Sequence, residues 1–395
     1  MRRRVAVTGA GILCALGDGC DVVWKNLLAG VCGVKPLTRF PAGDMRSPMC
    51  AEVMPFQEPG CDGVGFADTM AIHAAREALA SAGLESLPPD SGVAVGTGVS
   101  GLPESEEAYL AHLGGAPLAR AVRPFARHLP ATAADLLAAR FGADGPLLSV
   151  VNACSSSTVA IGQGGEWIAS GECECVLAGA SDALSRLTQG GFNILRVVSK
   201  DRPRPFDKNR SGMIIGEGGA FLVLEALDRA VARGARIMAT LDGMGLSCDA
   251  HHATAPDAEG RGALAALRQC LEKSGTSVNE LDHINAHGTG TGPNDKAEGA
   301  AIRTLLGERA GEVPVISVKG AMGHCLGAAG ALEAVITVLS LFHQTVPPSV
   351  GFQEADPEIP LRVPREPIAM PLRHAISLSL AFGGNNAAIL FGRAP

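Results

Sequence analysis

A cysteine at the end of a short apolar run is the first residue whose surroundings suggest chemistry. Residues 149–153 read Ser-Val-Val-Asn-Ala, Cys154 follows, and three serines come directly after it. A thiol at the turn from a buried strand into a helix lies near unpaired backbone N–H groups and the positive end of the helix dipole. Such surroundings lower the pKa of a thiol below its free value of about 8.5 and favour the thiolate nucleophile. A buried structural cysteine is the alternative, because free cysteines are often buried.

Two histidines follow predicted strands in the second half of the chain. His287 lies in Ala-His-Gly-Thr-Gly-Thr at residues 286–291, and His324 follows Lys319 in Lys-Gly-Ala-Met-Gly-His. A single histidine is more often a satisfied core or surface residue than a catalytic one. Two histidines at equivalent turns, in a chain that also has a cysteine at a strand end, favour a catalytic set.

The composition is that of a globular enzyme. Of 395 residues, 47% are hydrophobic and 18% are charged, and the net charge is −7. A chain of this length can bury a large core and suggests two domains, or one domain built of two similar halves. The acidic balance argues against nucleic acid as a partner. No uninterrupted apolar stretch is long enough for a signal peptide or a membrane span, and the 11 cysteines contain no C-x-x-C pair. We therefore expect a cytoplasmic protein with reduced thiols.

Predicted strands and helices alternate along the chain, which favours a layered α/β fold with a mostly buried sheet in each half. Glycines at residues 9–11 are expected to end the first strand, and residues 101–130 are expected to form an insertion or cap over strand ends. The order of strand, turn and small-residue helix at 150–170 recurs at 315–341 as an internal similarity of pattern. Strands are predicted at 5–8, 175–180, 218–227, 239–245, 315–319, 376–380 and 387–391, and helices at 68–82, 157–170, 257–275, 298–306 and 326–341.

Taken together, these motifs resemble a β-ketoacyl-acyl carrier protein synthase of the elongating type, a condensing enzyme of the thiolase superfamily. The resemblance covers essentially the whole chain and includes Phe-Gly-Gly at residues 382–384. It implies a thiolase-like α/β fold in which two similar βα halves form a layered αβαβα sandwich. Residues 1–237 would carry the nucleophilic cysteine, and residues 238–395 the two histidines.

The resemblance implies a two-substrate reaction with no metal and no cofactor beyond the phosphopantetheine of an acyl carrier protein. An acyl group would move from a pantetheine thioester to Cys154, and the carbanion left when a malonyl thioester loses CO2 would attack the acyl-cysteine. His287 and His324 would stabilise the developing oxyanion. The backbone N–H groups of Cys154 and Phe382 would stabilise the oxyanion of acyl transfer, and the Phe382 ring would gate access.

The same resemblance assigns supporting residues. Lys319 is expected to give electrostatic support and to pair with Glu298, because an unpaired buried ammonium would be costly. Thr289 and Thr291 would hydrogen-bond the amides of the pantetheine arm, with plain turn residues as the alternative. Thr254 lies in a loop that matches one beside the same arm.

Two stretches depart from the family pattern. The gating turn begins with Ala381 where the family usually reads Gly-Phe-Gly-Gly-Thr-Asn, so the hinge should be stiffer. Residues 61–68 lack the basic cluster with which many relatives dock the acidic carrier protein. Part of that patch is expected at Arg196, with Lys200, Arg202 and Arg204, and a solvated arginine is the alternative. These departures point to a dedicated carrier protein and to a specialised pathway such as polyketide or polyene synthesis, in place of housekeeping fatty acid elongation.

Two other classes of protein remain as alternatives. A non-catalytic partner subunit, of the kind that sets chain length in a ketosynthase heterodimer, would typically lack the cysteine. A thiolase acting on coenzyme A esters would have a second cysteine where this chain has His324. The resemblance also implies a dimer, either of two identical chains or with a related ketosynthase-like subunit.

Overall fold

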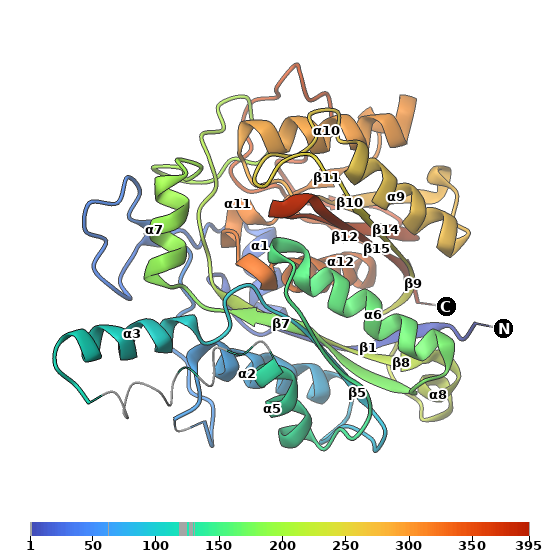
Figure 1. Cartoon of the computed structure of the whole chain (residues 1–395). Helices are drawn as coiled ribbons and strands as arrows, with labels where there is room; N and C mark the ends of the chain where they lie inside the picture. The colour runs from blue at the N-terminus through green and yellow to red at the C-terminus, as the bar shows by residue number, and fades with distance from the viewer. Residues whose placement is uncertain (1, 62, 118–124, 126–128, 130, 395) are drawn as a thin grey trace.

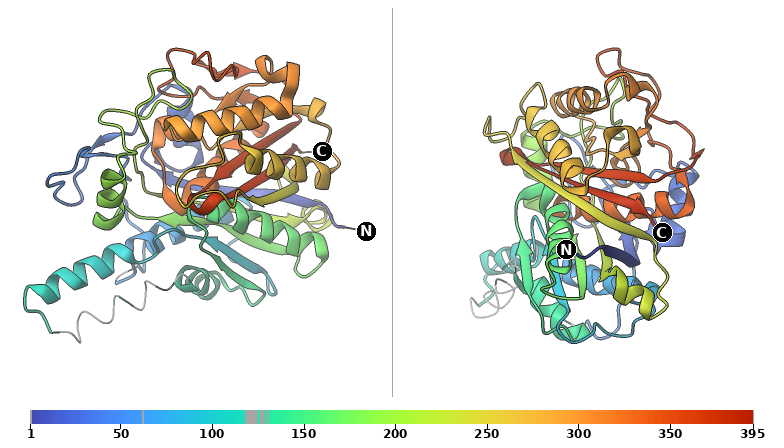
Figure 2. Two further views of the ribbon diagram at one scale, coloured as in Figure 1. Left: turned by 45° about the horizontal axis from the view of Figure 1, so that its top comes forward. Right: turned by 90° about the vertical axis from the view of Figure 1, so that its right-hand side faces the viewer.

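The computed structural model describes residues 2–61, 63–117, 125, 129 and 131–394, and its helices and strands form layers (Figure 1). Two long helices form the middle layer, a sheet lies on each side of them, and further helices cover the outer face of each sheet (Figure 2). The αβαβα arrangement predicted from the sequence is therefore present.

The first sheet carries the strands that lead to the cysteine. In space its order is β1, β8, β7, β5 and β6. β1 and β7 each run antiparallel to β8, whereas β5 runs parallel to both β7 and β6. The outer face is covered by α2 and α5. The bounds are β1 (Val5–Cys14), β5 (Gly92–Gly96), β6 (Leu147–Val150), β7 (Cys175–Asp182), β8 (Gly218–Ala226), α2 (Phe66–Ser81) and α5 (Ala131–Phe141).

The second sheet carries the strands that lead to the histidines. Its order is β11, β10, β14, β15 and β9, with β10 parallel to both of its neighbours and the other pairs antiparallel. β9 also pairs with the start of β1, where Val5 lies opposite Leu241, so the two sheets join along one edge. The bounds are β9 (Ala239–Cys248), β10 (Leu281–Asn285), β11 (Val315–Ile316), β14 (His374–Leu380) and β15 (Asn385–Arg393), with α9 (Arg261–Ser274) and α10 (Gly292–Leu306) outside.

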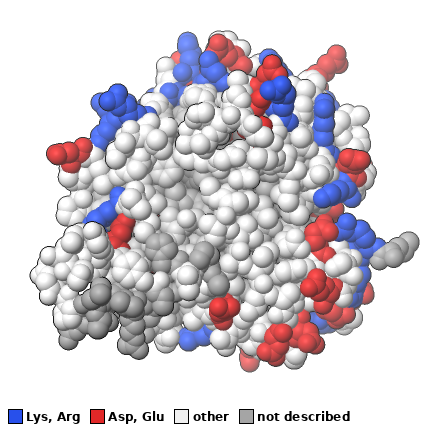
Figure 3. Space-filling view, viewed as in Figure 1, with Lys and Arg blue, Asp and Glu red and all other residues white. Residues whose placement is uncertain are grey.

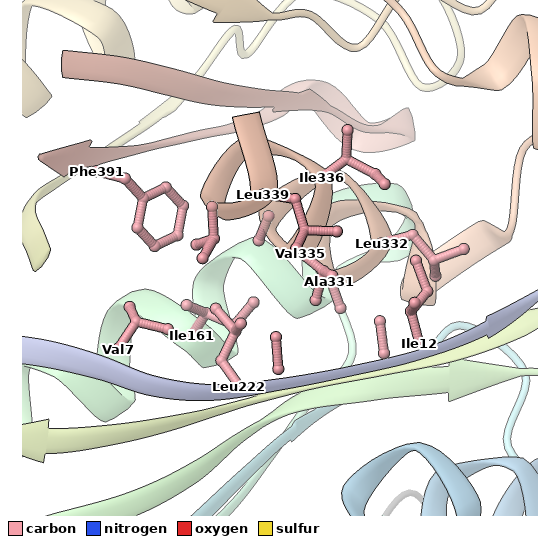
Figure 4. Close-up of a cluster of buried hydrophobic side chains, with 14 of the residues drawn as sticks. Val7, Ile12, Ile161, Leu222, Ala331, Leu332, Val335, Ile336, Leu339 and Phe391 are labelled. Atoms are coloured by element: carbon pink, nitrogen blue, oxygen red, sulfur yellow. The ribbon is translucent and has the colours of Figure 1, made fainter. Parts of the chain in front are cut away.

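The middle helices α6 (Ser156–Ser170) and α12 (Ala329–His343) form the centre of the core. Side chains of α12 such as Leu332 and Val335 meet Ile161 of α6 and Leu222 of β8 between the sheets (Figure 4). The segment Leu326–His343 is long and apolar enough to cross a membrane, and 89% of it is buried inside the protein. The apolar character of α12 on all sides is explained by its position in the core, packed between two sheets.

Both middle helices begin after a strained 3₁₀ turn. The turn Ala153–Ser155 precedes α6 and starts with Ala153 at φ 58°, and the turn Leu326–Ala328 precedes α12 and starts with Leu326 at φ 53°. A positive φ is rare for a residue with a side chain. The two helix starts touch, because the backbone N–H of Ala331 donates to Ser157 Oγ at 2.9 Å.

Three predicted elements differ from the structure. The helix predicted at 298–306 begins six residues earlier, at Gly292. The first strand continues to Cys14, because Gly9 and Gly11 serve close packing and do not form a turn: a Cβ at Gly9 would overlap the carbonyl oxygen of Ala78 in α2. The strand predicted at 315–319 ends at Ile316, and Lys319 begins a short helix.

In the predicted insertion at 101–130, α3 extends away from the body of the molecule (Figure 2). Residues 118–124, 126–128 and 130 of that segment lie outside the described residues. The other elements are β2 (Gly17–Asp18), α1 (Cys20–Leu28), β3 (Lys35–Pro36), β4 (Met49–Cys50), α3 (Leu102–Leu113), α7 (Arg186–Ile194), α8 (Leu227–Ala232), α11 (Lys319–Met322), β12 (Thr345–Val346) and β13 (Ile368–Ala369).

Candidate active site

The fold brings the cysteine and both histidines to one point. Cys154 sits in the turn before α6, His287 follows β10, and His324 lies between α11 and the turn before α12. All three side chains are buried, and the Cys154 Sγ and one nitrogen of each imidazole lie within 4.8 Å of one another. A cysteine from the first half of the chain and two histidines from the second half therefore form a single cluster.

The Cys154 thiol is protonated in the resting protein at neutral pH. Burial raises its pKa to about 11, and this effect exceeds the opposing effects of the Lys319 charge and of a hydrogen bond from the Phe382 backbone N–H. The lowered pKa predicted from the helix start is wrong, because removal of the thiolate from water outweighs the favourable charges.

His287 is held as a neutral ring with its proton on Nε2. The Nζ of Lys319 lies 3.2 Å from His287 Nδ1 and donates to the His287 carbonyl oxygen at 2.6 Å. An ammonium group has only donors, so Nδ1 must accept and Nε2 must carry the ring proton. Burial, the Lys319 charge and the neighbouring imidazole keep the pKa of His287 well below its usual value.

His324 reaches the same state by a different contact. The backbone N–H of Leu326 donates to His324 Nδ1 at 3.2 Å, which leaves the proton on Nε2. Burial and the Lys319 charge hold the pKa of His324 well below its usual value. The two rings stand edge to face with centroids 5.2 Å apart. The site therefore contains two neutral imidazoles, each with one N–H donor available.

Lys319 pairs with Glu333, and the predicted pair with Glu298 is wrong. The Lys319 ammonium contacts a Glu333 carboxylate oxygen, and both side chains are almost completely buried. Glu298 instead accepts the backbone N–H groups of His287 and Gly288 at 2.6 and 2.7 Å, and so holds the histidine turn. Sequence reasoning missed Glu333, although a single carboxylate in the apolar α12 signals a buried partner.

The turn Phe382–Gly384 joins β14 to β15 above the cysteine. Its Gly383 N–H donates to the Ala253 carbonyl at 2.8 Å, and the Phe382 ring packs against Phe192 with centroids 5.8 Å apart. Ala381 is extended, with φ −131°, so alanine fits the hinge without strain. The turn is thus tied to the loop that carries Thr254.

A cavity of about 120 Å³ leads to the cluster. Thr289 Oγ1 and Thr291 Oγ1 lie 2.8 Å apart on one side of it, and Thr254 also lines it. Arg196 does not line this cavity; it is exposed beside Arg46 and Lys200, in an open hollow past the end of α7. The cavity is lined by the site residues Cys154, Thr254, His287, Thr289, Thr291, His324 and Phe382 together with apolar residues that include Phe192, Val197, Met213 and Leu380.

The cluster also has the donor types of a metal site. A thiolate and two imidazoles within 4.8 Å of one another could reach one ion. The Lys319 ammonium beside His287 opposes a cation there, as its effect on the pKa of both histidines indicates. The arrangement is better suited to stabilising an anion.

Both halves of the chain match one protein family. Residues 2–230 match the model of the β-ketoacyl synthase N-terminal domain, and residues 238–353 match the model of the C-terminal domain. The 3-oxoacyl-[acyl-carrier-protein] synthase 2 of Coxiella burnetii (strain RSA 493 / Nine Mile phase I) is 36% identical over 413 residues, with 99% of each chain covered. The chain belongs to the β-ketoacyl synthase family. It is a condensing acyltransferase of fatty acid or polyketide synthesis, and its substrates are carried on phosphopantetheine without a further cofactor.

Solved ketosynthases share its fold. The structure of the ishigamide ketosynthase/chain length factor aligns over 100% of both chains, with a TM-score of 0.94 and 34% identity. A type II PKS ketosynthase, solved in complex with its acyl-carrier protein and bound to the hexaketide, aligns over 100% of both chains, with a TM-score of 0.93 and 29% identity. The fold class and the family predicted from the sequence are confirmed.

Proposed function

We propose that Cys154, His287 and His324 are the catalytic set of this β-ketoacyl synthase, with Lys319 and Phe382 assisting. The supporting observation is the convergence of one thiol and two neutral imidazole N–H donors in a single cavity. A non-catalytic partner role has no support, because the cysteine and both histidines are in place.

Acyl transfer comes first. The Cys154 thiol gives up its proton, its sulfur attacks the carbonyl carbon of an acyl-pantetheine thioester, and the bond from that carbon to the pantetheine sulfur breaks. The departing pantetheine sulfur takes up the proton that the Cys154 thiol released, so no net proton is gained or lost. The backbone N–H of Cys154 and that of Phe382 stabilise the intermediate oxyanion; the Phe382 N–H already contributes a hydrogen bond to the sulfur.

Condensation follows on the acylated enzyme. The carbon–carbon bond to the malonyl carboxylate breaks, CO2 leaves, and the electron pair moves into the thioester as an enolate. The Nε2–H groups of His287 and His324 donate to the enolate oxygen. The enolate carbon then attacks the acyl carbonyl on Cys154, the carbon–sulfur bond breaks, and the released thiolate takes up one proton. Loss of one donor aimed at such an oxyanion lowers the rate by about 10²- to 10³-fold.

The pantetheine arm binds along the cavity. Thr254, Thr289 and Thr291 lie on its wall, and threonine hydroxyl groups can both donate to and accept from the amides of the arm. The carrier protein docks outside, where exposed Arg46, Arg196 and Lys200 surround an open hollow beside the exposed Ile194. Three cations around an apolar residue suit an acidic carrier with an apolar contact. Residues 61–68 have no basic side chains, so the basic residues lie at this other surface. Their position supports the proposal of a dedicated carrier protein and of a specialised polyketide or polyene pathway.

A second ketosynthase-like chain pairs along the first sheet. β6 is the last strand of that sheet and has β5 as its only strand partner in the described part of the chain, and Leu147 and Val151 are exposed beside it. The face with α6 and α5 in front has few charges at its centre and many at its margin, as in protein interfaces (Figure 3). A second copy is proposed as the partner, and a related subunit is the alternative outcome of sedimentation and mass measurements.

We also infer that the chain consists of two similar halves, 1–237 and 238–395, and works in the cytoplasm. The matching turns at Ala153 and Leu326 support the two halves. Fractionation of the producing cells would test the location.

Acyl loading tests the proposal. The protein is incubated with hexanoyl-pantetheine and examined by intact mass spectrometry. An adduct is expected on wild type and none on Cys154→Ala, while His324→Ala is expected to load and to release little CO2 from malonyl-pantetheine. An adduct that persists in the cysteine variant would refute the assignment.

A further inference from the structure

Asp182, which lies outside the catalytic set, joins the two halves of the molecule beneath the site. It is the last residue of β7, and its side chain is fully buried. Its carboxylate accepts the Thr97 hydroxyl at 2.9 Å and the backbone N–H groups of Gly98 and Val99 at 2.7 and 3.0 Å. The backbone N–H of Gly327, in the second half, bonds to the same carboxylate. One side chain therefore ties a first-half loop to the turn that precedes α12.

That turn also sets the orientation of His324. Leu326 donates its backbone N–H to His324 Nδ1 and has a positive φ of 53°. A leucine in this conformation persists only where the surrounding structure holds it. Asp182 binds the very next N–H, and Gly327 packs so closely on Gly98 that an added Cβ would overlap the Gly98 nitrogen.

The first-half loop is itself anchored to the strand that leads to the cysteine. The backbone N–H of Thr97 donates to the Val150 carbonyl of β6 at 3.0 Å, four residues before Cys154. Asp182 is thus connected through hydrogen bonds to the histidine turn on one side and to the cysteine strand on the other.

We infer that Asp182 is a positioning residue, which keeps the Leu326–Gly327 backbone in place so that the Nε2–H of His324 points at the enolate oxygen. Asp182 acts through the backbone and does not contact the reacting atoms. Acyl transfer uses the backbone donors of Cys154 and Phe382, whereas malonyl decarboxylation uses His324. Loss of Asp182 should therefore slow decarboxylation more than acyl loading.

The inference rests on the proposed function, and the test separates the two. Full-length wild type, Asp182→Asn and a control are compared for single-turnover loading from hexanoyl-pantetheine and for CO2 release from malonyl-pantetheine on the acylated protein. The control is Asp207→Asn, because Asp207 is equally buried and accepts the N–H groups of Asn209, Gln353 and Glu354 at 2.6–2.7 Å. Folded fractions are matched by urea titration.

For Asp182→Asn we expect loading within about threefold of wild type and CO2 release lower by about 10- to 100-fold, because small displacements of an aligned donor have effects of this size. The control should keep the ratio of the two rates. If Asp182→Asn does not fold, Thr97→Val replaces it in the test, because this variant removes one donor to the carboxylate and keeps the carboxylate itself. The ratio of CO2 release to loading should then fall in the same direction by a smaller factor. Equal losses of both rates would overturn the inference, whereas a wild type that does not load would overturn the proposed function.

Discussion

The buried Lys319–Glu333 pair predicts that a second substitution can restore the stability lost in Lys319→Met without restoring the activity. In Lys319→Met, Glu333 loses its counter-ion while it stays in a site where burial already raises its pKa to about 7. Without the lysine this pKa rises further, so the folded variant holds a neutral carboxyl at neutral pH. Protonating at pH 7 a group whose unfolded pKa is about 4.3 costs about 3.7 kcal/mol, and at pH 5 only about 1 kcal/mol.

The sign follows from the raised folded-state pKa. The penalty is absent below the unfolded pKa and grows as the pH rises. Wild type already carries part of this penalty, because its Glu333 pKa is about 7. The reference is therefore the double variant Lys319→Met/Glu333→Gln, and relative to it Lys319→Met should lose about 2.7 kcal/mol of stability between pH 5 and pH 7. Adding Glu333→Gln removes the titrating group and should restore the pH-dependent part. Activity should not return, because the Nδ1 of His287 still lacks its donor and Nε2 no longer has to carry the proton. We expect decarboxylation to stay about 10²-fold below wild type in both variants.

Urea titrations of the three proteins at pH 5 and pH 7 measure the stability, and CO2 release from malonyl-pantetheine measures the activity. A stability difference between Lys319→Met and the double variant that is the same at both pH values would refute the role of the buried carboxyl. Recovery of CO2 release in the double variant would refute the tautomer assignment for His287.

Three further predictions concern titration and docking. Alkylation of Cys154 by iodoacetamide should accelerate about tenfold per pH unit between pH 7 and 10, because burial raises its pKa to about 11; a rate that levels off near pH 8.5 would contradict this. As the pH drops from 7 to 5, each neutral histidine should lower the free energy of unfolding by up to about 1.4 kcal/mol per pH unit, because His287 and His324 accept protons near pH 6.5 only when unfolded; buried carboxyls with raised pKa, such as Glu333, contribute the opposite slope. His324→Gln should reduce that slope, and an unchanged slope would count against the buried neutral ring. Arg196→Glu should raise the KM for an acidic carrier several-fold with little change in kcat, and the difference should shrink in 0.5 M salt because the pair is exposed; a salt-independent loss would argue against docking there.

Much of the fold was predictable because its signals are local. Strands that end in polar turns and small-residue helices are visible in short windows, and they yielded the alternation behind the αβαβα layers. The exceptions have tertiary causes. Gly9 and Gly11 look like a turn in isolation, yet they lie within β1 because α2 packs on them. Lys319 follows a strand-like run, yet it begins α11 where the chain turns toward the site.

The residue types that are available for chemistry can be read from the amino-acid sequence. Cys154, His287 and His324 stand out through their own neighbours, and the family follows from those motifs. The protonation states and contacts of these groups follow from the folded arrangement around them. The Cys154 pKa is raised and not lowered, because desolvation depends on everything packed around the sulfur. Lys319 pairs with Glu333 of the central helix and not with Glu298. The contact of Lys319 with His287 and that of the Leu326 backbone with His324 determine which imidazole nitrogens carry protons. Except for the Leu326 contact, which lies two residues from His324, these properties depend on residues distant in the chain, so no local pattern could encode them.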